Sequence, residues 1–83
     1  MNNGELFVGT IVRKGNQKFV VTEVSVNGIC GTPIESGAIT GGKLSAGTIW
    51  PPFETTSMFW ELIQLKEAMR VAGFAEETIA LVG

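Results

Sequence analysis

The 83-residue sequence contains no histidine, no aspartate and no tyrosine, and Cys30 is its single cysteine. Without histidine and aspartate, Ser-His-Asp triads and imidazole metal sites are excluded. Cys30 and the glutamates have no obvious neighbouring base to activate them for catalysis. A single cysteine also rules out an intrachain disulfide and argues against a small secreted scaffold. We therefore predict a protein that is not an enzyme and holds no metal and no cofactor.

Charged residues are also few, at 17% of the chain, and the net charge is −2. This balance provides no overall attraction to nucleic acid or to an anionic membrane. No apolar run approaches the length of a membrane span, and no basic-then-apolar leader opens the sequence. We expect a cytoplasmic protein without a membrane partner.

The hydrophobic fraction of 45% excludes a disordered chain, and the length fits one domain spanning residues 1–83. Residues 5–50 contain short strand-like runs at 6–13, 18–26, 29–34 and 43–50, the last strongest at 48–50, with a further short one at 38–40. Asn27-Gly28 predicts a tight type I′ hairpin between two of them. These residues therefore predict four or five short strands in a small antiparallel β-barrel or curled meander.

A meander of this size, with short glycine turns, is similar in architecture to small SH3-like barrels. The resemblance covers roughly residues 5–50 and includes no family motif. It therefore implies a fold but no binding residues.

Residues 55–73 predict one long amphipathic helix. Its apolar positions are spaced by four, three, four and three residues, which lines one helical face with Met58, Leu62, Leu65, Met69 and Ala72. The hydroxyls of residues 55–57 are suited to cap its start, and Gly73 is suited to a left-handed cap at its end. A short terminal helix is predicted at 75–82. The expected fold is therefore α+β: an SH3-like barrel or meander followed by a long and then a short helix.

Four apolar residues are candidates for a protein interface: Trp50, Phe53, Trp60 and Ile63. The first two flank Pro51-Pro52, whose extended backbone and aromatic neighbours are typical of interface anchors. The alternative is that all four cover the core of their own chain. The leading hypothesis is a non-enzymatic interaction module that binds a partner protein or a second copy of itself. Such a module suits a small accessory protein of a phage or mobile element.

A basic hairpin tip supports a competing hypothesis. Arg13, Lys14 and Lys18 surround the first predicted turn, where they are able to contact phosphates of a nucleic acid. Three charges without interleaved aromatic residues make a small patch, and a solvated hairpin end is the simpler explanation for them.

Overall fold

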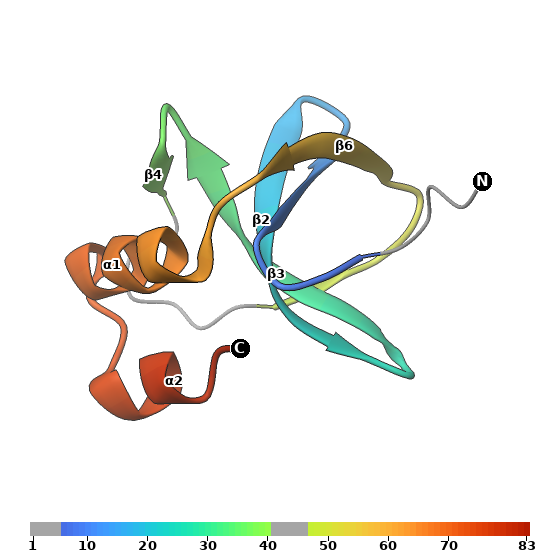
Figure 1. Cartoon of the computed structure of the whole chain (residues 1–83). Coiled ribbons are helices and arrows are strands. Elements are labelled where there is room, and N and C mark those ends of the chain that lie inside the picture. The colour runs from blue at the N-terminus through green and yellow to red at the C-terminus, as the bar shows by residue number, and fades with distance from the viewer. Residues whose placement is uncertain (1–5, 41–46) are drawn as a thin grey trace.

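The fold is known from a computed structural model, which describes residues 6–40 and 47–83 (Figure 1). The described part contains six strands and two helices. In chain order these are β1 (Thr10–Lys14), β2 (Gln17–Ser25), β3 (Gly28–Glu35), β4 (Ala38–Ile39), β5 (Gly47–Ile49), β6 (Glu54–Phe59), α1 (Leu62–Ala72) and α2 (Glu76–Ala80).

All six strands belong to one antiparallel sheet with the order β4-β3-β2-β1-β6, and β5 also pairs with β3. The outer edge of β3 is thus shared: β4 takes one end of it and β5 takes the other. Among the described residues, no pairing joins β6 to β4 or β5, so the sheet is open. The α+β class with an antiparallel sheet is confirmed, whereas the predicted SH3-like barrel is wrong.

The turns between strands differ from the sequence prediction in one place. Ser25 pairs with Gly28, so the β2–β3 turn lies at Val26 and Asn27, one residue earlier than predicted.

The turn after β3 lies at Ser36 and Gly37. In the described residues, Ser36 is the only non-glycine residue with positive φ, at 55°, and Gly37 follows at 80°. Two consecutive positive φ values are what a type I′ turn requires. That turn therefore joins β3 to β4.

The long helix predicted for residues 55–73 is also wrong, because its first part is strand β6. Thr55 pairs with Val12 and Phe59 pairs with Thr10, so β6 satisfies backbone groups at the edge of β1. The helix begins only at Leu62. From Leu62 onward the apolar spacing does correspond to a helix, and Leu65 and Met69 are its buried residues.

Strand β6 contains a bulge of three residues opposite one. Between the pairs Thr10–Phe59 and Val12–Thr55, one residue of β1, Ile11, faces the three residues 56–58 of β6. The Thr56 hydroxyl holds the bulge together: it donates to the Ile11 carbonyl at 2.7 Å and accepts from the Met58 N–H at 3.1 Å. Met58 is 57% exposed, so its helical spacing in the sequence does not reflect burial.

The sheet is apolar on both faces. Figure 1 shows α1 and α2 together at one side of the sheet. The first core lies between the sheet and the C-terminal part of the chain and consists of Ile11, Val20, Ile34, Ile39, Trp60, Leu65, Met69, Phe74, Ile79 and Val82. A second core contains Val12, Val21, Ile29 and Ile49, with Leu6, Phe19 and Phe53 packed against it. Because alternate strand residues point to opposite faces, β1 and β2 contribute to both cores.

A glycine cap ends α1. Gly73 has a φ of 100°, its N–H donates to the Arg70 carbonyl at 3.1 Å, and the Phe74 N–H donates to the Met69 carbonyl at 3.0 Å. This pair of bonds is the Schellman arrangement, in which a left-handed residue satisfies the last helical carbonyls. The predicted cap at Gly73 is confirmed. It also turns Phe74 into the first core, where it is 7% exposed.

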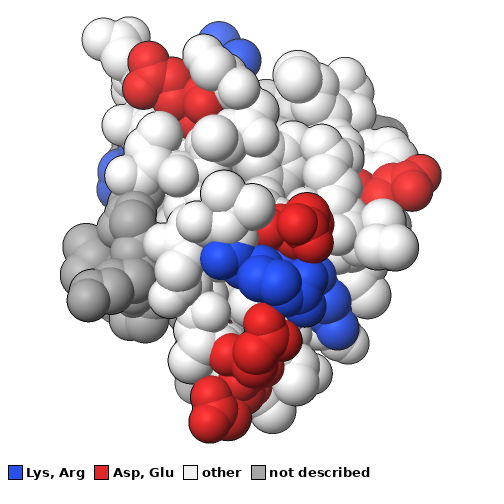
Figure 2. All heavy atoms as spheres, turned by 90° about the vertical axis from the view of Figure 1, so that its left-hand side faces the viewer, with Lys and Arg blue, Asp and Glu red and all other residues white. Residues whose placement is uncertain are grey.

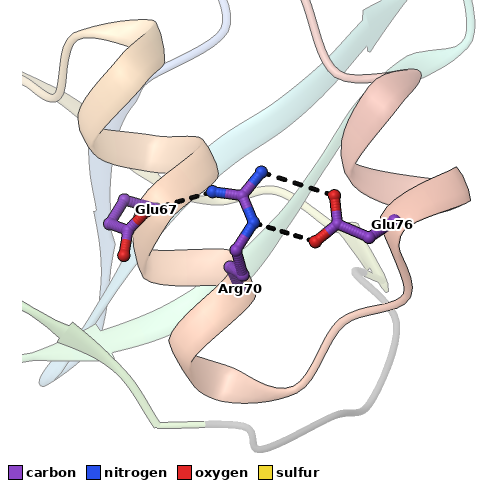
Figure 3. A network of polar contacts seen from close by, with 3 residues as sticks. All are labelled: Glu67, Arg70 and Glu76. Carbon is purple, nitrogen blue, oxygen red and sulfur yellow. Dashed lines mark hydrogen bonds and ion pairs between the residues drawn. The ribbon is translucent and has the colours of Figure 1, made fainter.

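Arg70 then connects the two helices (Figure 3). Its guanidinium lies between Glu67 of α1, at 3.0 Å, and Glu76 of α2, at 2.8 Å. The hydrogen bond from Arg70 lowers the pKa of Glu76 below its ordinary value, and the positive charge acts in the same direction. The ion pairs are exposed, so they orient α2 more than they stabilise it.

Gly9 joins three segments of the fold. Its N–H donates to the Val21 carbonyl of β2, and its carbonyl accepts from the Trp60 N–H, both at 2.8 Å. It has a φ of 100°, and a Cβ at this position would lie 2.2 Å from the Trp60 carbonyl oxygen. Only glycine fits this conformation and this close approach. Gly9 therefore fixes the point where β6 ends and the chain turns toward α1.

We expect Gly9→Ala to lower the free energy of unfolding by about 2–4 kcal/mol, because it adds a backbone clash to the strain of positive φ. Gly15→Ala is the matched control: Gly15 has a φ of 64°, but its Cβ would meet no atom within 4 Å. The control should lose only about 1–2 kcal/mol. Urea denaturation of both variants measures the difference. Equal losses would contradict a close packing of Gly9 against Trp60.

The Arg70–Glu76 pair predicts a pH-dependent stability. Because the folded-state pKa of Glu76 is lowered, its contribution is present above the ordinary glutamate pKa of about 4.3 and is lost as the pH falls through the lowered value. Glu76→Gln should thus melt below the wild type at about pH 7 and level with it at about pH 2 in low salt. Glu77→Gln is the control, because Glu77 forms no ion pair with any described residue. A melting difference that does not change with pH would contradict the pair.

Candidate functional site

The first hairpin and the connection between β5 and β6 meet at one end of the sheet. The ammonium group of Lys14, the last residue of β1, donates a hydrogen bond to the Trp50 carbonyl, with Nζ and O 2.5 Å apart. Its neighbour Arg13 forms an ion pair with Glu54, the first residue of β6. Lys14 of the predicted basic site and Trp50 of the predicted apolar site are therefore adjacent in the structure.

A groove of about 300 Å³ lies beside Trp50. We call it the Trp50 groove, and it is lined by Lys14, Phe19, Gly31, Pro33, Gly47, Thr48, Ile49 and Trp50. Phe19 and Pro33 are cross-strand neighbours on β2 and β3, and Ile49 enters from β5, which pairs with β3. Apolar side chains make most of the walls, and Lys14 is the one charged residue among the lining residues that the structure describes.

Trp50 is 67% exposed although it stands beside this apolar wall. Its backbone is restrained on both sides: β5 ends at Ile49, and Pro51 and Pro52 follow with fixed φ. The bond from Lys14 adds a third restraint. These restraints act on the backbone of Trp50, so they reduce the conformational entropy that ordering this residue in a complex would cost.

Phe53 has a different role. It is half-buried and packs against the second core, with Val12 and Ile49 among the buried residues of that cluster. With Arg13, Gly15, Asn16, Pro52 and Glu54 it also lines a neighbouring hollow of about 430 Å³. The paired Arg13 and Glu54 are both in its lining, so this hollow is more polar than the Trp50 groove. Phe53 thus attaches the connection between β5 and β6 to the second core, while the side chain of Trp50 is exposed to solvent.

The other two predicted interface residues lie elsewhere. Trp60 is 9% exposed and belongs to the first core, so its side chain is not part of a free surface. Ile63 is 79% exposed on α1. Figure 1 shows α1 and the connection from β5 to β6 on opposite sides of the molecule. The structure therefore does not join the four residues into one patch.

The three cations of the hairpin tip do not form one patch either. Arg13 and Lys18 are directly opposite each other on β1 and β2, and Arg13 also faces Glu54 on β6. Lys14 points to the other face of the sheet, because successive strand residues alternate. The ion pair and the bond to Trp50 already engage Arg13 and Lys14. Lys18 lines a separate hollow with Ile34 and Glu35.

The helical face also lacks a broad region of one charge. Figure 2 shows that face, with basic and acidic side chains next to one another and wide uncharged areas between them. This mixture agrees with the Arg70 ion pairs that join α1 and α2.

The structure also contains an exposed pair of aromatic side chains that the sequence did not predict. Phe7 and Phe59 meet edge to face, with ring centroids 5.9 Å apart, and are 52% and 55% exposed. Sequence reasoning placed Phe59 on a helix, which separated it from Phe7. The β-branched pair Thr55-Thr56 is the signal that would have placed Phe59 on a strand beside the N-terminal segment.

The described residues offer few groups suited to metal binding or covalent chemistry. Among the described residues, no three potential metal ligands of the His, Cys, Asp and Glu types lie together, and Cys30 is a half-buried free thiol. Neither described helix has the length and hydrophobicity required to cross a bilayer. No family model matches the chain, and no curated protein or solved structure is similar enough to count as a relative.

The two tryptophans should differ in their access to a quencher. In dilute solution we expect acrylamide to quench Trp50 strongly and Trp60 weakly, because they are 67% and 9% exposed. Trp50→Phe should therefore lose most of the quenching, and Trp60→Phe should keep it. Circular dichroism checks that both variants are folded. Equal quenching of the two variants would contradict the exposed position of Trp50.

Proposed function

We propose that this protein is a non-enzymatic interaction domain that recognises protein through the Trp50 groove. The observation that carries the proposal is a tryptophan with a restrained backbone and 67% exposure beside an apolar groove. Truncation of such an anchor typically costs a complex about 2 kcal/mol or more. The cytoplasmic location and the phage or mobile-element origin stay predictions from the sequence.

Charge favours a protein ligand over a nucleic acid. Binding to phosphates gains its affinity from several free cations that release counterions. Here Glu54 balances the charge of Arg13, and the remaining cations of the hairpin tip, Lys14 and Lys18, line separate hollows. The groove itself is walled by Phe19, Pro33 and Ile49, which match an apolar side chain better than a phosphate.

A displayed library of random peptides tests the proposal. We expect selection on the immobilised wild-type domain to enrich sequences whose binding is lost on Trp50→Ala. Ile63→Ala is the matched control, since it truncates another exposed apolar residue, on α1. Enriched peptides should bind this control as well as the wild type.

Two outcomes would overturn the proposal. One is the absence of any peptide whose binding depends on Trp50. The other is equal binding of enriched peptides to the wild type and Trp50→Ala, which would place recognition elsewhere. A single-stranded oligonucleotide that binds and is released by moderate salt would instead favour the basic residues.

A further inference from the structure

We infer that Asn27-Gly28, at the tip of the β2–β3 hairpin, is a site of spontaneous covalent modification at which Asn27 is converted to aspartate and isoaspartate. Asparagine is among the thermolabile residues of proteins. Here its side-chain amide is followed by a glycine, and the missing Cβ lets the next backbone nitrogen approach that amide. The tip is separate from the Trp50 groove, because no residue of 23–28 is among the described residues that line it.

The tip of this hairpin lies away from both cores. Residues 23–28 are all exposed, and Val26 is fully exposed. Figure 1 shows the β2–β3 hairpin extending beyond the rest of the sheet. Because no side chain of residues 23–28 is buried, local opening of the tip costs little free energy. Asn27 and Gly28 are therefore able to change conformation while the rest of the sheet stays paired.

Two weak contacts of the Ser25 hydroxyl hold the turn. It accepts a hydrogen bond from the Asn27 N–H at 3.3 Å and donates one to the Gly28 carbonyl at 3.2 Å. Ser25 and Gly28 are the last pair of the β2–β3 ladder, where strand pairing opens most readily. Neither bond uses the side-chain amide of Asn27, and a Cβ added to Gly28 would meet no atom within 4 Å. The Gly28 nitrogen and the Asn27 side chain thus have room to meet.

The reaction requires only water and hydroxide. The backbone nitrogen of Gly28 loses its proton to hydroxide and bonds to Cγ of Asn27. The bond from Cγ to Nδ2 breaks, and Nδ2 takes a proton from water and leaves as ammonia. Water then opens the resulting succinimide ring: cleavage at Cγ gives aspartate, and cleavage at the backbone carbonyl carbon gives isoaspartate. In total, water is consumed and ammonia is released, with no change of oxidation state.

Both products change the chemistry of the tip. Each has a carboxylate in place of the amide, so each adds a negative charge at neutral pH to a chain that contains no aspartate. Isoaspartate also lengthens the main chain by one carbon, which disturbs the Ser25–Gly28 pair. The modification therefore alters both the charge and the strand pairing of this hairpin.

Incubation of the intact protein at about pH 7 and about pH 9, followed by tryptic peptide mapping, tests the inference. Cleavage after lysine and arginine leaves Asn27 as the single asparagine of peptide 19–43 and Asn16 as that of peptide 15–18. Asn16 is the matched control, because it is also exposed in a hairpin turn but precedes Gln17, which has a Cβ. A sample digested without incubation corrects for conversion during the digest.

We expect peptide 19–43 to gain about 1 Da and to separate into aspartate and isoaspartate forms. Its conversion should be roughly tenfold or more faster than that of the Asn16 peptide, because glycine leaves the attacking nitrogen unhindered. It should also be roughly tenfold or more faster at the higher pH, because hydroxide removes the Gly28 proton. Asn27→Gln keeps an amide but requires a larger ring, so it should stay unmodified. Circular dichroism confirms that this variant is folded.

Three results would overturn the inference. The first is equal conversion of the Asn27 and Asn16 peptides. The second is conversion of a synthetic peptide 19–43 under conditions in which the intact protein keeps Asn27, since this would show that the hairpin protects it. The third is aspartate without isoaspartate, which would indicate direct hydrolysis of the amide rather than attack by the Gly28 nitrogen.

Discussion

The pairing of β6 with the edge of β1 is the constraint on which the rest of the structure depends. It makes residues 54–59 a strand and ends at Gly9, where the Trp60 N–H binds the Gly9 carbonyl. From that point Trp60 enters the first core and α1 follows. At the other end of β6, Glu54 lies beside Arg13, which brings the preceding connection to the tip of the first hairpin. The helical core and the Trp50 groove are therefore two consequences of one strand pairing.

The second core helps to form the Trp50 groove, because Ile49 and Phe19 belong to both. A sheet with one apolar face would leave the connection from β5 to β6 in solvent, whereas here Phe53 and Ile49 attach it to the face opposite the helices. Trp50 is then held above that face by its neighbours and by Lys14.

The sequence predicted the local features and missed those set by distant contacts. The β-branched run near residue 20 and the glycine cap at Gly73 depend on neighbours in the chain, and both are present. Residues 55–61 satisfy the helical spacing and the strand propensity at the same time, and only the vacant edge of β1 decides between them. The two tryptophans show the same limit. Each follows an apolar residue, Ile49 or Phe59, yet Trp60 is buried and Trp50 is exposed.

The bulge in β6 has a consequence for how this protein meets its neighbours. A regular edge strand presents evenly spaced amide and carbonyl groups, onto which another chain is able to add as a further strand. In β6, three residues oppose one, and the Thr56 hydroxyl occupies the Met58 amide, so this spacing is interrupted. The edge at β3 is divided between two very short strands. Among the described strands, the two edges of the sheet therefore offer another chain no long, regular row of backbone groups to pair with.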